Sequence, residues 1–191
     1  GTVDTSFSSP DFGNGTGYGG AILAIGVQSD GKIVVGGDIY GVNGIFNKKI
    51  YRLNPNGSLD NTFQSPSFGS GGIVYDLEIQ PDDKIVAGGD FSITTNGGAN
   101  KFMRLNADGT LDPTFANFTT VGTVYGIEVQ SDGKILTAGS ALVRRHTDGS
   151  SDLTFNGVAI NGSGVMLSMQ LAPDGKVFVG GQFNNLNGFS I

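Results

Sequence analysis

The stretch "RLNADGTLDPTF" at residues 104–115 decides the fold, because the chain spells it more than once. Variants are "RLNPNGSLDNTF" at 52–63 and "RRHTDGSSDLTF" at 144–155, and the chain opens with the related stub "GTVDTSF". We call this twelve-residue pattern the closing phrase. Internal similarity at a regular spacing is typical of solenoids, propellers and other arrays of one small unit. The sequence therefore predicts several copies of a single structural unit.

A second phrase alternates with the first, in the form Gln-x-x-Gly-Lys followed by an apolar run and glycine. Its four copies are "QSDGKIVVGGD" from Gln28, "QPDDKIVAGGD" from Gln80, "QSDGKILTAGS" from Gln130 and "QLAPDGKVFVGGQ" from Gln170. We interpret the fourth copy as carrying an insertion after its glutamine. The lysines of the four copies are 52, 50 and 42 residues apart, so one repeat is about 40–52 residues long.

Each repeat has the pattern of three or four short strands. "VYDLEIQ" alternates, with Leu77 and Ile79 on one side and Glu78 and Gln80 on the other, as in a strand with one buried face. A tight hairpin turn follows, in which Asp-Gly supplies the left-handed backbone conformation. The next run, "KIVAGG", is almost continuously apolar, as in a strand buried on both faces. Since no stretch shows helical periodicity with caps, the predicted fold class is all-β.

Antiparallel strands in repeats of this length match the blades of a β-propeller. A single blade cannot bury both of its faces and needs neighbours. The recurring glycine pair fits either close backbone packing near a central axis or a β-bulge. We predict one repeat domain over residues 1–191, as part of a larger propeller, with an open β-solenoid as the alternative. The expected blades are 8–63, 64–115, 116–155 and a truncated 156–191, preceded by the end of another repeat at 1–7.

The order "QxDGKIvvGGdF…RLNxDGxLDxTF" resembles the delta-60 repeat family of β-propeller-like repeats over nearly the whole chain. Departures are local: Asp83 replaces a turn glycine, Arg145 and His146 replace Leu-Asn, and Ser151 replaces a leucine. The resemblance implies a large bacterial surface or secreted protein, or a phage structural protein such as a fibre. It therefore implies a location that is extracellular, on the cell surface or on the virion exterior.

Charge and composition narrow the partners that we expect. The net charge is −6 and the pI is near 4.5, without a lysine-rich block. A surface that follows nucleic-acid phosphates needs clustered cations, so nucleic acid is not a predicted partner. Apolar runs are shorter than ten residues, so membrane insertion is not predicted either. Thiol chemistry is excluded because the sequence has no cysteine.

The segment between the glycine pair and the closing phrase varies in length. From Gly89 to Arg104 the separation is 15 residues, but from Gly139 to Arg144 it is 5, which predicts a surface loop. The longer loops are rich in asparagine, glycine, aromatic and aliphatic residues. Such loops gather on one face of a propeller and make its contacts. The candidate binding residues are Tyr40, Asn43, Phe46, Asn96, Asn184 and Asn185.

The closing phrase also admits a calcium hypothesis. Asn106, Asp108 and Asp112 place oxygens at alternate positions around Gly109, as in a calcium loop. However, the glutamate that ends such a loop is absent, and the sister copies replace some of these residues. We favour a hairpin turn held by asparagine and aspartate, in which the later aspartate fixes the entry to the last segment. No metal or cofactor is therefore predicted.

Few residues suggest catalysis. His146, the only histidine, is predicted in an exposed turn. Glu78 and Glu128, the only glutamates, occupy equivalent positions in successive repeats. Two carboxylates can cleave glycosides at a suitable separation, but solvent-facing strand positions are the simpler interpretation. Asp38 and Asp90 follow glycine pairs, whereas the other copies have serine or glutamine there, which breaks a ring of carboxylates.

The sequence thus favours a non-enzymatic structural or binding module of a larger exterior protein. Its expected partners are other protein subunits or a surface glycan, and a homo-oligomer remains open. The alternative is a hydrolase or lyase with a carboxylate-lined propeller channel.

Overall fold

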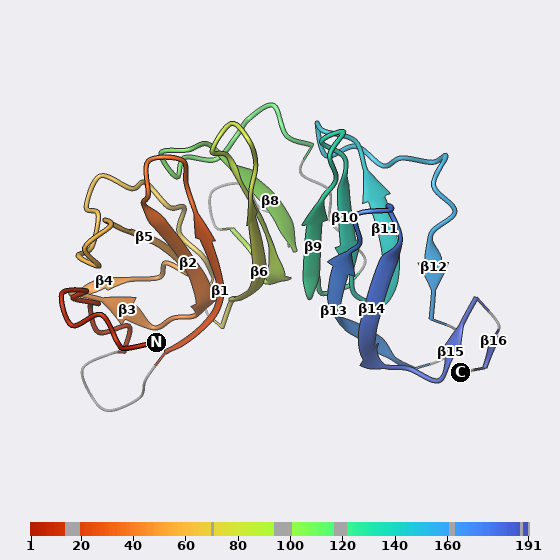
Figure 1. Cartoon of the computed structure of the whole chain (residues 1–191), viewed down its shortest axis with the longest axis horizontal. Coiled ribbons are helices and arrows are strands. Elements are labelled where there is room, and N and C mark those ends of the chain that lie inside the picture. The colour runs from red at the N-terminus through yellow and green to blue at the C-terminus, as the bar shows by residue number, and fades with distance from the viewer. Residues whose placement is uncertain are drawn as a thin grey trace.

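The computed structural model describes residues 1–13, 20–69, 71–93, 101–116, 122–160, 163–187 and 189–190. Within these ranges all regular elements are β-strands, which confirms the predicted all-β class. No helix in the described part is long and apolar enough to cross a membrane. Figure 1 shows the sheets side by side in an arc, from the red N-terminal sheet to the blue C-terminal one.

The described strands form four antiparallel sheets, here called blades 1 to 4, and two short hairpins. Blade 1 contains β1 (Ala21–Val27), β2 (Ile33–Asp38) and β5 (Ile50–Leu53). Blade 2 contains β6 (Ile73–Ile79), β7 (Ile85–Asp90) and β8 (Phe102–Leu105). Blade 3 contains β9 (Gly126–Val129), β10 (Ile135–Ala138), β11 (Ala141–Arg145) and β12 (Val158–Ala159). Blade 4 contains β13 (Val165–Leu171) and β14 (Val177–Gln182). The hairpins are β3 (Gly41–Val42) with β4 (Ile45–Phe46), and β15 (Asn185–Leu186) with β16 (Phe189–Ser190).

Each blade packs on the next through its first strands, with β1 against β6, β6 against β9 and β9 against β13. In blades 1 and 2 the first glycine of the pair makes this packing possible. A Cβ atom on Gly36 would lie 2.8 Å from Val74 Cγ1 of blade 2, and one on Gly88 would lie 2.4 Å from Val124 Cγ1 of blade 3. A larger residue at either position would therefore push the blades apart.

The second glycine of the pair allows close packing within its own blade. A Cβ atom on Gly37 would lie 1.9 Å from the carbonyl oxygen of Ala21, and one on Gly89 would lie 2.0 Å from that of Ile73. In both blades the first strand has a register shift close to these carbonyls. The β-bulge explanation thus fits the second glycine, whereas the first glycine makes room for a valine side chain of the next blade rather than for another backbone.

Two sequence interpretations are wrong. The side of β6 that carries Glu78 and Gln80 was expected to face solvent, but Gln80 is buried and Glu78 is half-buried, because the next blade covers that side. The fourth lysine phrase contains no insertion. Ala172 donates its N–H to the Lys176 carbonyl at 2.8 Å, as Gln80 does to Lys84. Ala172 therefore takes the glutamine's place in blade 4.

The closing phrase forms a buried ion cluster around its second aspartate. In blade 2, Asp112 Oδ2 accepts from Arg104 Nε at 2.8 Å and lies 3.2 Å from Lys84 Nζ. Asp112 Oδ1 accepts from the N–H and hydroxyl of Thr114. Burial alone would raise the pKa of Asp112, but the bonds from Thr114, Lys84 and Arg104 outweigh it and hold that pKa well below its usual range. The equivalent ion pairs are Asp60 with Arg52 and Lys32, and Asp152 with Arg144 and Lys134.

The same residues tie each blade to the next in an arrangement that we call the clasp. Arg52 Nη1 donates to the carbonyl oxygen of Ala107, in the turn of the following blade's closing phrase, at 2.6 Å. Gln28 accepts from Arg52 through Oε1 and donates to the same Ala107 carbonyl through Nε2. The ring of Phe63 lies over that turn, where a Cβ atom on Gly109 would approach it to 2.7 Å. The next clasp joins Arg104 to the Thr147 carbonyl and Phe115 to Gly149.

The opening stub packs in the manner of a closing phrase. Asp4 Oδ1 accepts from the N–H and hydroxyl of Ser6, as Asp112 does from Thr114. Phe7 lies against Gly57 in the turn of blade 1, and Ser8 donates its N–H to Asn56 at 2.9 Å. Residues 1–7 therefore supply blade 1 with the contact that blade 1 supplies to blade 2.

Replacing Gly109 with alanine should destabilise the fold through the clasp. Gly109 has φ +91°, and its added methyl group would collide with the Phe63 ring. Gly31→Ala is the matched control, because Gly31 has φ +82° but its nearest contact, Pro55 Cγ, is at 3.5 Å. In urea unfolding, Gly109→Ala should cost about 1–3 kcal/mol more than Gly31→Ala. Equal losses would mean that backbone strain, not the clasp, requires the glycine.

Removing the buried aspartate should cost far more than removing an exposed aspartate of the same phrase. Asp112→Ala leaves Arg104 and Lys84 without their shared anion, so we expect a loss of about 3–5 kcal/mol. Asp108→Ala removes an exposed turn aspartate bonded to Thr110 and should cost about 1 kcal/mol or less. Urea unfolding at neutral pH measures both. Similar losses for the two variants would contradict a stabilising role for the ion cluster.

Candidate functional site

The first variable loop is a short hairpin at the edge of blade 1, formed by β3 and β4. Its turn, Asn43-Gly44, has φ values of +49° and +80°, the conformation of a type I′ turn. The Tyr51 hydroxyl donates to the Ile45 carbonyl at 2.9 Å and holds the hairpin on the blade. Burial raises the pKa of Tyr51 to about 12, so the phenol stays protonated as a donor at neutral pH.

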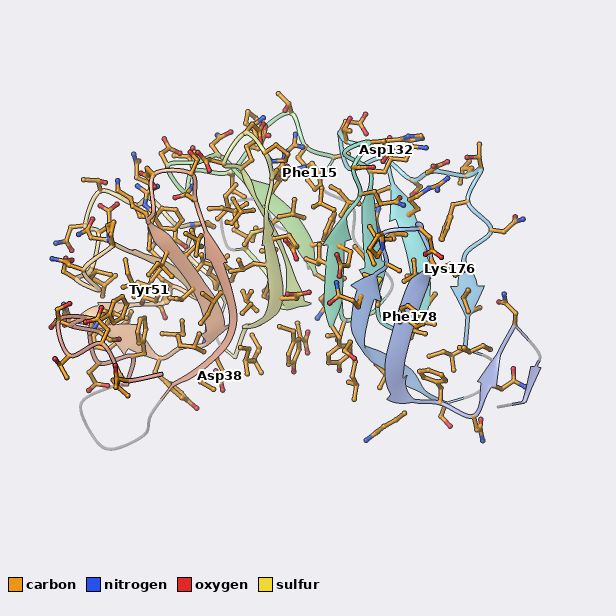
Figure 2. The ribbon with its side chains drawn as sticks, in the orientation of Figure 1. Asp38, Tyr51, Phe115, Asp132, Lys176 and Phe178 are labelled. Carbon is orange, nitrogen blue, oxygen red and sulfur yellow. The ribbon has the colours of Figure 1, made fainter. Side chains whose placement is uncertain are left out.

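Tyr40, Ile45 and Phe46 are exposed apolar residues in and beside the hairpin, with 48, 41 and 55% of their surfaces accessible. Tyr40 also lines a pocket of about 230 Å³ between the loops of blades 1 and 2. In this pocket Lys49 Nζ lies 3.3 Å from Asp38 Oδ1 and 5.5 Å from the centroid of the Tyr40 ring. Figure 2 places Asp38 at the lower edge of the arc, on the side of the β3–β4 hairpin. We call these three exposed residues and the pocket together the hairpin site.

The structure brings three of the candidate binding residues together and leaves the others apart. Tyr40, Asn43 and Phe46 share the β3–β4 hairpin. Asn184, which is exposed, and Asn185, which is half-buried, belong to the β15–β16 region at the opposite end of the arc (Figure 1). There Asn187, with φ +50°, repeats the conformation of Asn43. Asn96 lies outside the described residues.

A group of half-buried carboxylates lies between the first strands of neighbouring blades. Asp76 Oδ2 accepts from the N–H of Ile127 in blade 3 at 2.6 Å. Glu128 Oε1 accepts from Gln170 Nε2 and from the N–H of Leu171 in blade 4, at 3.0 and 3.1 Å. The expected solvent-facing role of the glutamates is therefore wrong, because they lie where blades meet.

The environment of this carboxylate group disfavours negative charge. Burial, opposed in part by hydrogen bonds from Ile127 and Leu77, raises the pKa of Asp76 to about 6. Burial and the neighbouring Asp76 and Glu128 raise the pKa of Glu78 to about 7. Sequence reasoning missed Asp76. The signal was a second carboxylate on the side of the strand that carries Glu78, at the register position of Ala24 and Ser168.

The proposed calcium ligands are engaged by the protein itself. Asp108 Oδ1 accepts from the N–H and hydroxyl of Thr110, and Asn106 Nδ2 donates to that hydroxyl at 3.0 Å. Asp112 is paired with Arg104 and Lys84. In the described ranges no group of three or more His, Asp or Glu side chains is placed to hold a metal ion. These residues form the turn held by asparagine and aspartate side chains that the sequence analysis favoured over a calcium loop.

Blade 3 has a groove that sequence reasoning did not anticipate. It has a volume of about 380 Å³ and is lined by Leu142, Arg144, Ser151, Leu153 and Phe155 among others. The matching hollow in blade 1 measures about 50 Å³, and its lining includes the loop residues Ile45 and Lys48 and the phrase residue Leu59. The signals for the groove were the ten-residue shorter loop and the serine at position 151.

Repeated antiparallel blades joined through the turns of their closing phrases, with hairpins along one edge, define a β-propeller repeat domain. The sequence matches the family described as "Domain of unknown function (DUF5122) beta-propeller" at residues 28–63, 80–115, 130–155 and 172–190. The chain belongs to this family. Its fourth matched segment begins at Ala172, in agreement with the corrected alignment of blade 4. None of the curated proteins matches the chain.

Solved structures confirm the propeller fold and give no support to the open solenoid. The WD40 β-propeller domain of Doa1 aligns with a TM-score of 0.59 at 16% identity, over 87% of this chain and 49% of its own. Virginiamycin B lyase from Staphylococcus aureus aligns with a TM-score of 0.59 at 18% identity, over 89% and 55%. PorZ, a surface component of the type-IX secretion system of Porphyromonas gingivalis, aligns with a TM-score of 0.53 at 12% identity, over 97% and 27%. The chain thus spans about half or less of these structures.

The raised pKa of Glu78 predicts a dependence of stability on pH. The folded chain holds this proton between about pH 4.5 and 7, whereas the unfolded chain releases it, so stability falls as pH rises through that window. Glu78→Gln removes this loss. At pH 8 the variant should be more stable than the wild type by about 1 kcal/mol, a value already reduced for solvent screening. This corresponds to a melting temperature about 2–4 °C higher at pH 8, and the difference should be smaller at pH 4.5.

Thermal unfolding followed by circular dichroism at both pH values measures this difference. Asp132→Asn, at an exposed aspartate in a hairpin turn, is the control for the loss of one negative charge. A Glu78→Gln shift that is the same at both pH values would contradict the prediction.

Proposed function

We propose that this chain is a non-catalytic structural and binding module of a larger exterior protein, extracellular, on the cell surface or on a virion, and that its hairpins contact protein or glycan. The observation that supports the proposal most directly is the hairpin site. A hairpin fixed by its I′ turn and by Tyr51 holds Tyr40 and Phe46 exposed beside a pocket containing an ion pair.

The chemistry of the hairpin site suits both kinds of partner. Exposed aromatic rings stack on the apolar faces of sugars and serve as anchors in protein interfaces. The carboxylate of Asp38 accepts hydrogen bonds from hydroxyl groups, and Lys49 beside it supplies a donor. A pre-formed site loses little conformational entropy on binding. Similarity to PorZ, a bacterial surface component, supports the exterior location.

Binding to a glycan array tests the proposal. Tyr40→Ala and Phe46→Ala should each weaken binding about tenfold or more, corresponding to about 1.4 kcal/mol, while the melting temperature changes little, because both side chains are exposed. Leu153→Ala is the control, since Leu153 is 92% exposed but lies beside the blade 3 groove. Binding that both aromatic variants retain would contradict the role of the hairpin site. If no glycan binds, the same variants test protein contact.

The carboxylates between blades support a second candidate, a hydrolase or lyase. Raised pKa values at Asp76 and Glu78 are what a general acid at neutral pH requires. Hydrogen bonds to the backbones of the next blades favour the structural role for Asp76 and Glu128. Turnover of a polysaccharide that Glu78→Gln abolishes and Tyr40→Ala leaves intact would favour the enzyme.

A further inference from the structure

The blade 3 groove and the small hollow of blade 1 occupy the same place in two copies of the repeat. Each is lined by the third strand of its blade, by the closing phrase and by the residue two places after the closing phenylalanine, Ser65 in blade 1 and Gly157 in blade 3. Both linings are local and cover residues 45–65 and 141–159. The turn of the next blade, which holds Ala107, is not part of the described lining of the hollow. A following blade therefore does not fill this place, which lies at the outer end of the blade, where Figure 1 shows β11 and β12.

In blade 1 the long loop fills the hollow. Ile45 and Lys48 line it, and Lys48 Nζ donates to the carbonyl oxygen of Ser65. The Tyr51 hydroxyl holds the loop in place through the Ile45 carbonyl. Blade 3 has a loop ten residues shorter, and Val143 stands at the register position of Tyr51. The volume is therefore about 380 Å³ in blade 3, against about 50 Å³ in blade 1.

Two further differences make the blade 3 groove wider and its rim apolar. Ser151 stands where blade 1 has Leu59, which removes apolar volume from the lining. Leu153, which is 92% exposed, stands where blade 1 has Asn61. Asn61 and its counterpart in blade 2, Pro113, are exposed as well, so exposure belongs to the position and only the leucine is particular to blade 3. Exposed apolar surface that continues into a groove is typical of a binding surface.

We infer that the blade 3 groove binds a separate protein through a large aliphatic side chain and a lysine three residues further along. The aliphatic side chain takes the place that Ile45 has in blade 1 and packs on Val143 and Leu153. The lysine donates to the carbonyl oxygen of Gly157, as Lys48 does to its counterpart in blade 1. The groove thus accepts from a partner the two side chains that a longer loop supplies in blade 1.

Charge and the blade 1 hollow identify the source of this segment. A net charge of −6 on the chain favours a partner that presents lysine. A second copy of the chain is a poor source, because its Ile45 and Lys48 already line its own hollow. The partner is therefore a different protein, and its site on blade 3 is separate from the hairpin site.

The loop of blade 1 serves as the probe. The synthetic peptide "YGVNGIFNKK", residues 40–49 of this chain, carries the pair of side chains on its hairpin sequence. We expect saturable binding of the labelled peptide to the full chain, measured by fluorescence anisotropy. Peptides with Ile45→Ala or Lys48→Ala should each bind about tenfold more weakly.

Variants of the chain locate the binding. Ser151→Leu restores the leucine of the other copies and narrows the groove, and Leu153→Ala removes the apolar rim. Each should weaken binding about tenfold or more. Both should keep the melting temperature of the wild type, which is measured alongside, because leucine is native at the first position and the second side chain is exposed. Pro113→Ala is the matched control, because it changes the same position of the phrase in blade 2, and it should leave binding unchanged.

Several results would overturn the inference. The parent peptide may be matched by both of its alanine variants, which would show that the groove does not recognise the pair. Binding that Ser151→Leu and Leu153→Ala both retain would place the peptide elsewhere on the chain. No peptide binding, together with binding of decanoate that Ser151→Leu blocks, would make the ligand a hydrocarbon rather than a protein. Light scattering that finds a dimer in the wild type and a monomer in Ser151→Leu would show that a second copy occupies the groove.

Discussion

A carboxylate that leaves water must be met by positive charge or by hydrogen-bond donors, and the closing phrase of blades 1 to 3 is built around this constraint. In blade 2 the Asp112 carboxylate receives a guanidinium, an ammonium and the two donors of Thr114. The planar guanidinium has five N–H donors, and Arg104 donates one of them, from Nη1, to the carbonyl oxygen of Thr147 in the next blade. The interaction that neutralises a charge inside one blade therefore also fixes the position of its neighbour.

The constraint explains why the rest of the phrase is small or turn-forming. The carbonyl that the arginine reaches must lie on the near side of a tight turn, which the left-handed Gly109 provides. The closing phenylalanine must cover that turn, and the same ring lies over the arginine: the guanidinium carbon of Arg104 is 4.5 Å from the Phe115 centroid. Arginine, glycine, aspartate and phenylalanine thus form one contact surface, and each depends on the other three.

The repeat pattern predicted the features that are local to one blade: its short antiparallel strands, its turns and the surface loop before its third strand, though not that this loop forms a hairpin in blade 1. It failed where the neighbouring blade decides the outcome. Alternation in "VYDLEIQ" suggests one solvated face, but the next blade packs against that face, so Gln80 is buried and Glu78 is half-buried. The blade 3 groove forms because its loop is ten residues shorter than in the other copies and because Ser151 stands where they have leucine. A sequence pattern shows which residues are absent but does not show that a groove results. Gln170 was misaligned because its residue type was matched, although Ala172 has the correct separation from Lys176.

The clasps and the hairpins occupy opposite edges of the arc: turns of the closing phrases lie along the upper edge in Figure 1, and β3–β4 and β15–β16 lie along the lower one. In blade 1 the loop residues Ile45 and Lys48 share a hollow with the closing phrase, whereas blade 3, with its shorter loop, still keeps the ion pairs of Asp152 with Arg144 and Lys134. The loop of a blade can therefore change in length while the ion cluster of that blade is kept. In a repeat protein of this kind, the loop of one copy can acquire a new binding specificity while the contacts between blades stay the same.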